Sequence, residues 1–356
     1  MKHYEKRLEQ DERDIRENTA VIAALVSEAL KNAVHAVRTG NQKLANLTVL
    51  GDGEINRAVR AVDHDCHRFI VRHLPSAGHL RLMSATIRAV IALERIGDYA
   101  VSIARVATRL STPPDHNLAT AMDNMAAESA EMLERAMQAF LDGNAEQAKA
   151  IALMADQVER LRAGALDDLA HGHAERTTDD LFAMFTLYSM LERVSDQAKN
   201  LCEEGVFSVT GQTKAAKVYR ILFLDREGAR LAPMAEALAR ENFPNSGKYQ
   251  SAALAPVQAL DPGMVKYMAT RGIDVGKVKP HLLDMGQTEL AEYHVVVSLQ
   301  GPIGNYLQEI PFHTATLEWD LAQAPDDSSL DFEAVYRALS VEVRVLMERL
   351  RGPEAD

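Results

Sequence analysis

The sequence predicts a multidomain protein with helical bundles in its N-terminal half and an α/β domain after them. Two observations predict this division. Of the 12 prolines, only Pro75, Pro113 and Pro114 precede residue 215, and a long region poor in proline and rich in Ala, Leu, Glu and Arg is typical of helices. Beyond residue 217, short β-branched runs alternate with helical segments, which indicates a parallel α/β sheet.

An internal repeat organises the helical half. "LERIGD" at 93–98 returns as "LERVSD" at 191–196, and each copy follows two other long helical patterns. The predicted helices cover 5–38, 42–73, 77–110, 115–141, 144–172 and 177–207. Short breaks such as "RTGN" and "LPSAGH" favour antiparallel neighbours. We therefore expect a pair of antiparallel three-helix bundles over residues 1–212.

The remaining residues predict a linker and an α/β domain. Small and polar residues indicate a linker at 213–217. "YRILFL" at 219–224 and "YHVVVSL" at 293–299 are typical of buried parallel strands, and the segments around 234–242 and 263–272 of helices. We expect the α/β domain to occupy residues 218–356.

Composition excludes several classes of protein. The net charge of −12 argues against a nucleic-acid binder held by phosphate contacts. The two cysteines, Cys66 and Cys202, form no CxxC pair and suit a reducing compartment. The charged N-terminus lacks the apolar core of a signal peptide, and no stretch reaches the roughly 18 apolar residues of a membrane span. We expect a cytoplasmic protein.

The repeated motif carries a pair of carboxylates. Glu94 and Asp98 are four residues apart and share one helix face, as do Glu192 and Asp196. Like charges at this spacing destabilise a helix, and a cation bound between them would compensate. The alternative is that the adjacent arginines neutralise the acids, or that the acids form a solvated face. The persistence of the pattern in both copies favours a cation site.

Residues 1–212 resemble the PhoU family of bacterial phosphate-signalling regulators. The resemblance rests on "INRAVRAVDHDCHRFIVRHLPSAGHLRLMSATIRAVIALERIGDYAVSIA", on "LERVSDQAKNLCE" and on the doubled Glu-x-x-x-Asp motif. It implies two three-helix bundles with one metal site each, holding iron, manganese, zinc or magnesium. The implied ligands are Glu94 and Asp98 in the first copy and Glu192 and Asp196 in the second. Further candidate ligands on the preceding helices are Asp63, Asp156 and Glu159.

The same resemblance implies a mode of action. Members of this family regulate phosphate transport and signalling negatively, by protein–protein binding. The implied partners are the ATPase subunit of the phosphate ABC transporter and the membrane-bound sensor kinase of the phosphate response. A homodimer is implied as well, with no nucleic acid bound and with the membrane approached only through partners.

The C-terminal domain resembles a second family, the low-molecular-weight protein tyrosine phosphatases and their arsenate reductase relatives. "ILFLDREGARLAPMAEAL", "YQSAALAP", "MATRGIDVGKVKPHLL" and "LEWDLAQAP" carry the resemblance, which runs from about residue 217 to 350. It implies a parallel sheet flanked by helices, with an anion-binding loop after the first strand. A strand that feeds a loop at a helix N-terminus suits phosphate, because free backbone N–H groups point at the anion.

The residues of catalysis are missing from that pattern. These enzymes place a nucleophilic Cys at the end of the first strand, then five residues, an Arg and a hydroxyl residue. Asp225, Leu231 and Ala232 stand there in this sequence, and the position of the general acid falls on Gln323 or Ala324. The sequence thus predicts a pseudophosphatase with no catalytic residues.

Two alternatives stay open at this point. Asp225, or an unrecognised nucleophile, could serve a phosphatase or an arsenate reductase-like enzyme, since aspartate is a nucleophile in some phosphotransferases. The degenerate anion loop, with Asp225, Arg226, Gly228 and Arg230, could instead sense anions weakly. The sequence favours a regulator that binds proteins over both.

Overall fold

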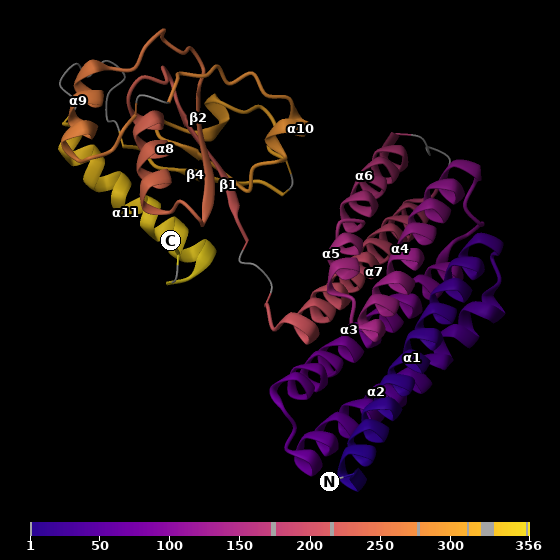
Figure 1. The fold of residues 1–356 in the computed structure, drawn as a ribbon. Coiled ribbons are helices and arrows are strands. Elements are labelled where there is room, and N and C mark those ends of the chain that lie inside the picture. Colours follow the sequence, from indigo (N-terminus) through magenta and orange to yellow (C-terminus); the bar gives the residue numbers. More distant parts are fainter. Residues whose placement is uncertain are drawn as a thin grey trace. The chain divides into compact units, whose positions relative to one another are not determined.

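A computed structural model describes most of the chain. The described residues are 2–171, 176–213, 217–275, 278–311, 313–321, 331–353 and 355–356. The chain divides into two compact units, Met1–Lys214 and Ala215–Asp356 (Figure 1). The linker expected at 213–217 lies partly outside the described residues.

The first unit is helical throughout its described residues apart from short connections. Its helices are α1 (Lys2–Thr39), α2 (Gln42–His73), α3 (Ala77–Arg109), α4 (His116–Asp142), α5 (Ala145–Ala152), α6 (Ala155–His171) and α7 (Thr178–Thr210).

Short breaks reverse the chain where the sequence predicts them. Gly40 at the end of α1 and Gly143 at the end of α4 adopt φ values of +66° and +63°, a conformation that glycine tolerates without strain. The side chains of Asn41 and Asn144 then accept hydrogen bonds from backbone N–H groups of the helices that follow. Each turn therefore ends one helix and caps the next.

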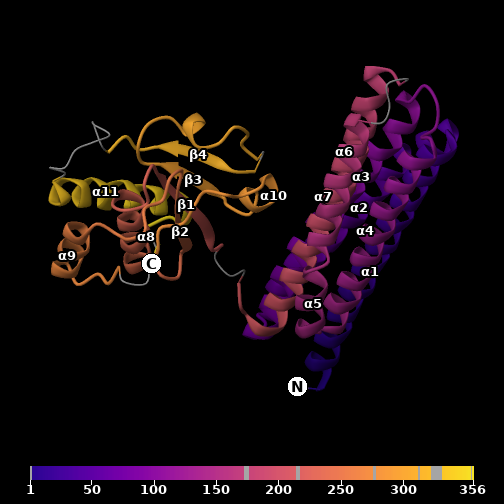
Figure 2. The same cartoon turned by 90° about the horizontal axis from the view of Figure 1, so that it is seen from above.

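The two three-helix bundles share one hydrophobic core. α3 lies beside α7, and α1 beside α4, in both views of the unit (Figures 1 and 2). Fully buried Leu93 and Ile96 from α3 belong to the same cluster as Leu187 and Leu191 from α7. Methionines such as Met125 fill this core. The predicted pair of antiparallel three-helix bundles is confirmed.

The middle helix of the second bundle differs from the prediction. A single helix over 144–172 was expected, but the structure breaks it into α5 and α6 at Leu153 and Met154. There the backbone hydrogen bonds tighten, because Leu153 N–H donates to Ala150 and Met154 N–H donates to Ile151. No proline or glycine stands at this break, so composition gave no signal for it.

Helix α1 bears on the expectation that the chain has no membrane span. It contains an 18-residue stretch with a mean hydropathy of 1.4, so its length and composition would permit a membrane span. Its apolar residues Ile22, Val26 and Leu30 are buried in the bundle core. Core helices of soluble proteins share this length and hydropathy, so the stretch alone does not indicate a membrane segment.

The second unit is built on a four-stranded parallel sheet. Its strands are β1 (Tyr219–Asp225), β2 (Gly247–Ala253), β3 (Val295–Ser298) and β4 (Ala315–Glu318). Its helices are α8 (Leu231–Asn242), α9 (Pro262–Thr270), α10 (Gln287–Leu290), the 3₁₀ turn η1 (Ile303–Asn305) and α11 (Phe332–Arg351).

The strand order β2-β1-β3-β4 places β1 at the centre of the sheet. Ile221 and Phe223 of β1 pack on one face with residues of α8, α9 and α11, whereas Leu222 and Leu224 pack on the other face beside α10 and η1. The chain leaves β1 toward β2 on one side, and β3 lies on the other, so the loop after β1 sits at a switch point of the sheet. The predicted parallel α/β fold is confirmed.

Asp180 fastens the segment after α3 to the start of α7. Its carboxylate accepts hydrogen bonds from the Ser111 backbone N–H at 2.8 Å and the Ser111 hydroxyl at 2.6 Å. These bonds lower the pKa of Asp180 below its ordinary value of 3.8. A carboxylate whose pKa is depressed by folding stabilises the protein above that ordinary value, and the contribution is lost as the pH falls through the folded pKa.

We predict that Asp180→Ala lowers the free energy of unfolding of the helical unit by about 1–3 kcal/mol at neutral pH, because the N–H and hydroxyl of Ser111 lose their hydrogen bonds to a charged acceptor. The measurement is urea unfolding followed by the helical circular dichroism signal. The control is Asp179→Ala, which removes the exposed carboxylate next to it. The difference between Asp180→Ala and wild type should shrink below about pH 4; equal stability at neutral pH would contradict the account.

Candidate functional site

The loop after β1 folds around the carboxylate of Asp225. Oδ1 of Asp225 accepts a hydrogen bond from Gly228 N–H at 2.5 Å, and Oδ2 accepts one from Ala232 N–H at 2.9 Å. Gly228 adopts a φ of +67°, and a β-carbon there would lie 3.1 Å from Ala253 Cβ. Glycine is therefore required at this position if its N–H is to face Asp225.

The Asp225 side chain is buried, and desolvation raises its pKa above the ordinary value, against the lowering effect of the loop N–H groups. A phosphate in this loop would accept hydrogen bonds from backbone N–H groups before and within the first turn of α8. Those of Gly228 and Ala232 already donate to the Asp225 carboxylate. As it stands, the loop is closed to an anion at this point.

The other residues of the predicted anion loop are buried or bonded to neighbouring residues. Leu231 and Ala232, at the positions of the enzymes' Arg and hydroxyl residue, are buried. Arg230 Nε lies 3.2 Å from Asp261 Oδ2, and the exposed Arg226 donates its backbone N–H to Gln300. The expected general-acid positions, Gln323 and Ala324, lie outside the described residues.

The two thiols are not nucleophiles of this site. Cys66 and Cys202 are both buried and free. Burial raises the pKa of each thiol to about 12, so both stay protonated at neutral pH. Each therefore serves as a small core residue of the helical unit.

The first acidic pair lies on α3 beside two polar residues of α2. Glu94 is half-buried and Asp98 is exposed. A β-carbon on Gly97 would lie 3.8 Å from Asp52 Oδ1, so the small residue of the motif leaves room for Asp52. Partial desolvation and the nearby Asp52 carboxylate raise the pKa of Asp98. The structure thus brings a second acid to this site.

Two oxygens at this place have no donor. Oδ1 of Asp52 and Oδ1 of Asn56 are buried and accept no hydrogen bond from any described residue. Asn56 Nδ2 donates to the other oxygen of Asp52 at 2.7 Å, which fixes both side chains. Carboxylate and amide oxygens are the ligands that hard cations prefer.

Asp52 was not among the residues predicted from the sequence, although its distance from the turn between α2 and α3 would have predicted that it lies opposite Asp98. Asp52 and Asp98 each lie 23 residues from Pro75, at the turn between two antiparallel helices, so they face each other. Asp63 lies nearer the turn, opposite Ile87 by the same reckoning. Its carboxylate lies 3.6 Å from His67 Nδ1 on its own helix.

The second acidic pair has a different environment. Arg162 Nε of α6 lies 2.9 Å from Glu192 Oε2, so an arginine from the neighbouring helix balances this acid. Asp196, Asp156 and Glu159 are exposed. The described residues contain no group of three or more His, Cys, Asp and Glu side chains arranged to hold a metal ion.

The helical unit matches a known family model. The model for the PhoU domain matches residues 20–107 and again residues 122–205, one match for each bundle. Over these residues the chain is similar to the PhoU family. Both copies of the Glu-x-x-x-Asp motif fall inside the matched PhoU domains.

Named relatives cover the same part of the chain. The phosphate-specific transport system accessory protein PhoU of Serratia marcescens is 27% identical over 213 residues, which are 59% of this chain and 88% of that protein. The crystal structure of PhoU from Pseudomonas aeruginosa is 28% identical, covers 57% of this chain and 99% of that one, and overlays with a TM-score of 0.53. The resemblance of residues 1–212 to PhoU is confirmed.

Solved structures also align with the α/β unit. An arsenate reductase in the phosphate-binding state is 20% identical, covers 37% of this chain and 99% of that one, and has a TM-score of 0.31. The tyrosine phosphatase Wzb from Escherichia coli K30 has the same TM-score and 16% identity.

Proposed function

We propose that this chain is an accessory regulator of phosphate transport and of the phosphate-starvation response, and that it acts by binding partner proteins. The observation that carries the proposal is the complete pair of PhoU domains, which aligns with 88% of a relative named as a phosphate transport accessory protein. Such a bundle offers long helix faces to partners and holds its core without a ligand.

The α/β unit serves this regulator as a binding or positioning domain and not as an enzyme. Asp225 occupies the N–H groups that phosphoryl transfer requires, at 2.5 and 2.9 Å, and no cysteine lies in this unit. The alternative, an aspartyl enzyme, would need the same carboxylate to leave these bonds and approach a phosphate of like charge. Electrostatic repulsion in a buried site opposes that approach.

We further propose that oxygen ligands of the helical unit bind a metal ion at its first acidic pair. Asp52, Asn56, Glu94 and Asp98 would hold the ion there, because two buried oxygens of α2 have no other donor. A bound cation supplies positive charge that offsets the repulsion between the carboxylates. All ligands are oxygens, which favours magnesium, manganese or iron over zinc.

The second pair, Glu192 and Asp196, is a weaker site in this proposal. Arg162 supplies positive charge at Glu192, which satisfies the need that a cation would meet. Asp156 and Glu159 on α6 remain candidate ligands for any ion that binds there.

The partners proposed are the ATPase subunit of the phosphate transporter and the sensor kinase of the phosphate response, in the cytoplasm, with the chain as a homodimer. The test is direct binding of the purified full chain to the ATPase subunit, measured by biolayer interferometry. We expect saturable binding that an isolated α/β unit does not reproduce. The proposal is overturned if the full chain binds neither the ATPase subunit nor the sensor kinase.

A further inference from the structure

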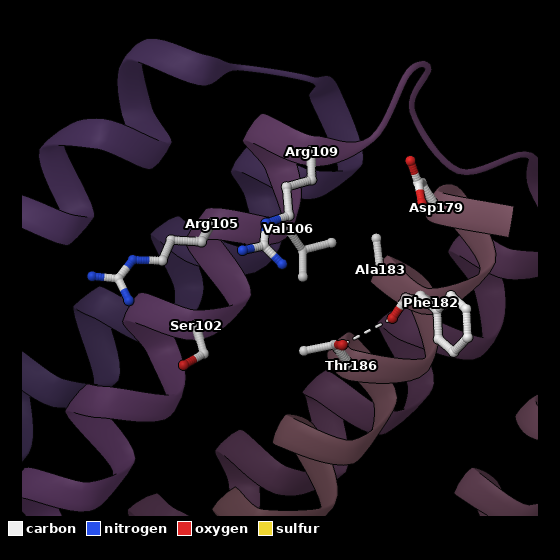
Figure 3. Close-up of a pocket in the computed structure, with 8 residues that line it drawn as sticks. All are labelled: Ser102, Arg105, Val106, Arg109, Asp179, Phe182, Ala183 and Thr186. Carbon is white, nitrogen blue, oxygen red and sulfur yellow. Dashed lines mark hydrogen bonds between the residues drawn. The ribbon is translucent and has the colours of Figure 1, made fainter. Parts of the chain in front are cut away.

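A groove runs between the end of α3 and the start of α7. Its volume is about 520 Å³, within the range of known binding pockets. Figure 3 shows Arg105 and Arg109 extending from α3 on one side, with Asp179 and Phe182 on α7 opposite them. Phe182 is 66% exposed, so its ring is available to an apolar contact.

Neither arginine of this groove forms an ion pair with a described residue, and both Arg105 and Arg109 are exposed. The hydroxyl of Thr186, on the groove wall, donates to the carbonyl of Phe182 in its own helix (Figure 3). Two like charges four residues apart repel each other, so an anionic group between them would relieve a local cost.

At the opposite end of the α3–α7 contact, here called the α3–α7 seam, an arginine of α3 is paired within the chain. There Arg88 of α3 places Nη2 2.6 Å from Glu204 Oε2 of α7. The guanidinium of Arg88 also lies 4.7 Å from the centre of the Phe207 ring. One end of the seam therefore combines arginine, carboxylate and aromatic ring from its own residues. The other end has the arginines, an exposed ring and the carboxylate of Asp179, which forms no ion pair with either arginine among the described residues.

We propose that the groove of Ser102, Arg105, Arg109, Phe182 and Thr186 docks an acidic segment of a partner protein. A Glu or Asp of the partner lies between the two arginines, and an apolar neighbour packs on Phe182. Arginine is among the residues most enriched at energetically dominant interface positions, and an exposed aromatic ring beside it adds apolar contact area. Because the chain carries a net charge of −12, this cationic groove is a place where an acidic segment meets attraction rather than repulsion. The inference rests on the proposed function and specifies how that regulator recognises a partner.

The test uses the full chain and a synthetic amphipathic peptide of leucine and glutamate labelled with a fluorophore, with a leucine–lysine peptide for comparison. Fluorescence anisotropy should show binding of the acidic peptide alone, weakening as salt is raised. Arg105→Glu with Arg109→Glu should weaken that binding at least about tenfold, and Phe182→Ser should weaken it with less dependence on salt. The matched control, Arg7→Glu with Lys43→Glu, makes the same change of charge at exposed sites on α1 and α2.

Equal affinity of the wild type, the groove variant and the control for the acidic peptide overturns the groove proposal, as does failure of the acidic peptide to bind. Circular dichroism confirms that each variant is folded. A separate experiment compares the expression of a phosphate-starvation reporter in cells with and without the chain. If reporter expression does not change when the chain is absent, the proposed function is overturned, independently of the peptide affinities. Failure of the proposed function and failure of the groove proposal are therefore distinguishable.

Discussion

Asp225→Ala is expected to turn the loop after β1 into an anion-binding loop. In the wild type the Asp225 carboxylate accepts from Gly228 and Ala232 N–H groups, and it supplies the only negative charge among these contacts. Removing it leaves two buried donors at the start of α8 without an acceptor, at about 1–3 kcal/mol each, partly offset by loss of a desolvated charge. The helix N-terminus then favours an external anion.

The measurement combines thermal unfolding with isothermal titration of inorganic phosphate. The variant should unfold at a lower temperature than the wild type and should regain about 2.7 kcal/mol when phosphate reaches 100 times its dissociation constant. The wild type and Asp284→Ala, which removes an exposed aspartate of the same unit, should not respond. Phosphate that stabilises the wild type as much as the variant would show that Asp225 does not close the loop. Turnover of phosphate esters by the wild type, lost in Asp225→Asn, would instead reveal an aspartyl enzyme.

Asp52→Ala combined with Asp98→Ala is expected to remove most of the metal bound to protein purified without chelator. These two acids come from adjacent helices, and the buried Oδ1 of Asp52 accepts no hydrogen bond from the described residues. The double variant would leave only two of the four proposed oxygen ligands, those of Asn56 and Glu94, for a cation that takes six or more. Elemental analysis by mass spectrometry gives the metal content per chain.

Matched variants separate the first acidic pair from the other candidates. Asp63→Ala changes an acid on the same helix as Asp52, yet its carboxylate lies beside His67, so the metal content should not change. Glu192→Ala with Asp196→Ala should remove less metal than the first-copy variant, because Arg162 already pairs with Glu192. The metal proposal is contradicted if the variant with alanine at Glu94, Asp98, Glu192 and Asp196 keeps its full metal content.

The fold could be predicted from the sequence because its signals are long and repeated. Helical composition without proline, the copies at Glu94 and Glu192, and β-branched runs such as "YHVVVSL" each extend over many residues. The break at Leu153 could not be predicted, since it depends on how α5 and α6 pack on α7 and carries no glycine or proline.

The sites were predicted only in part, because contacts across helices decide them. The i, i+4 acids are visible along one helix, but the approach of Asp52 to Asp98 depends on the register of two antiparallel helices. Similarly, the sequence shows that Asp225 replaces a cysteine. It does not show that the carboxylate turns inward and takes the loop N–H groups for itself.

In the proposed function the chain regulates phosphate transport by binding, with the helical unit as the effector. The most direct test of this function is phosphate uptake together with a phosphate-starvation reporter, in a host strain that lacks the chain and carries the full length, residues 1–212 or residues 218–356. Circular dichroism confirms that each fragment folds. We expect the full chain to restore repression, residues 1–212 to restore part of it, and residues 218–356 to restore none. Normal repression by residues 218–356 alone, or unchanged uptake in the strain without the chain, would contradict the account.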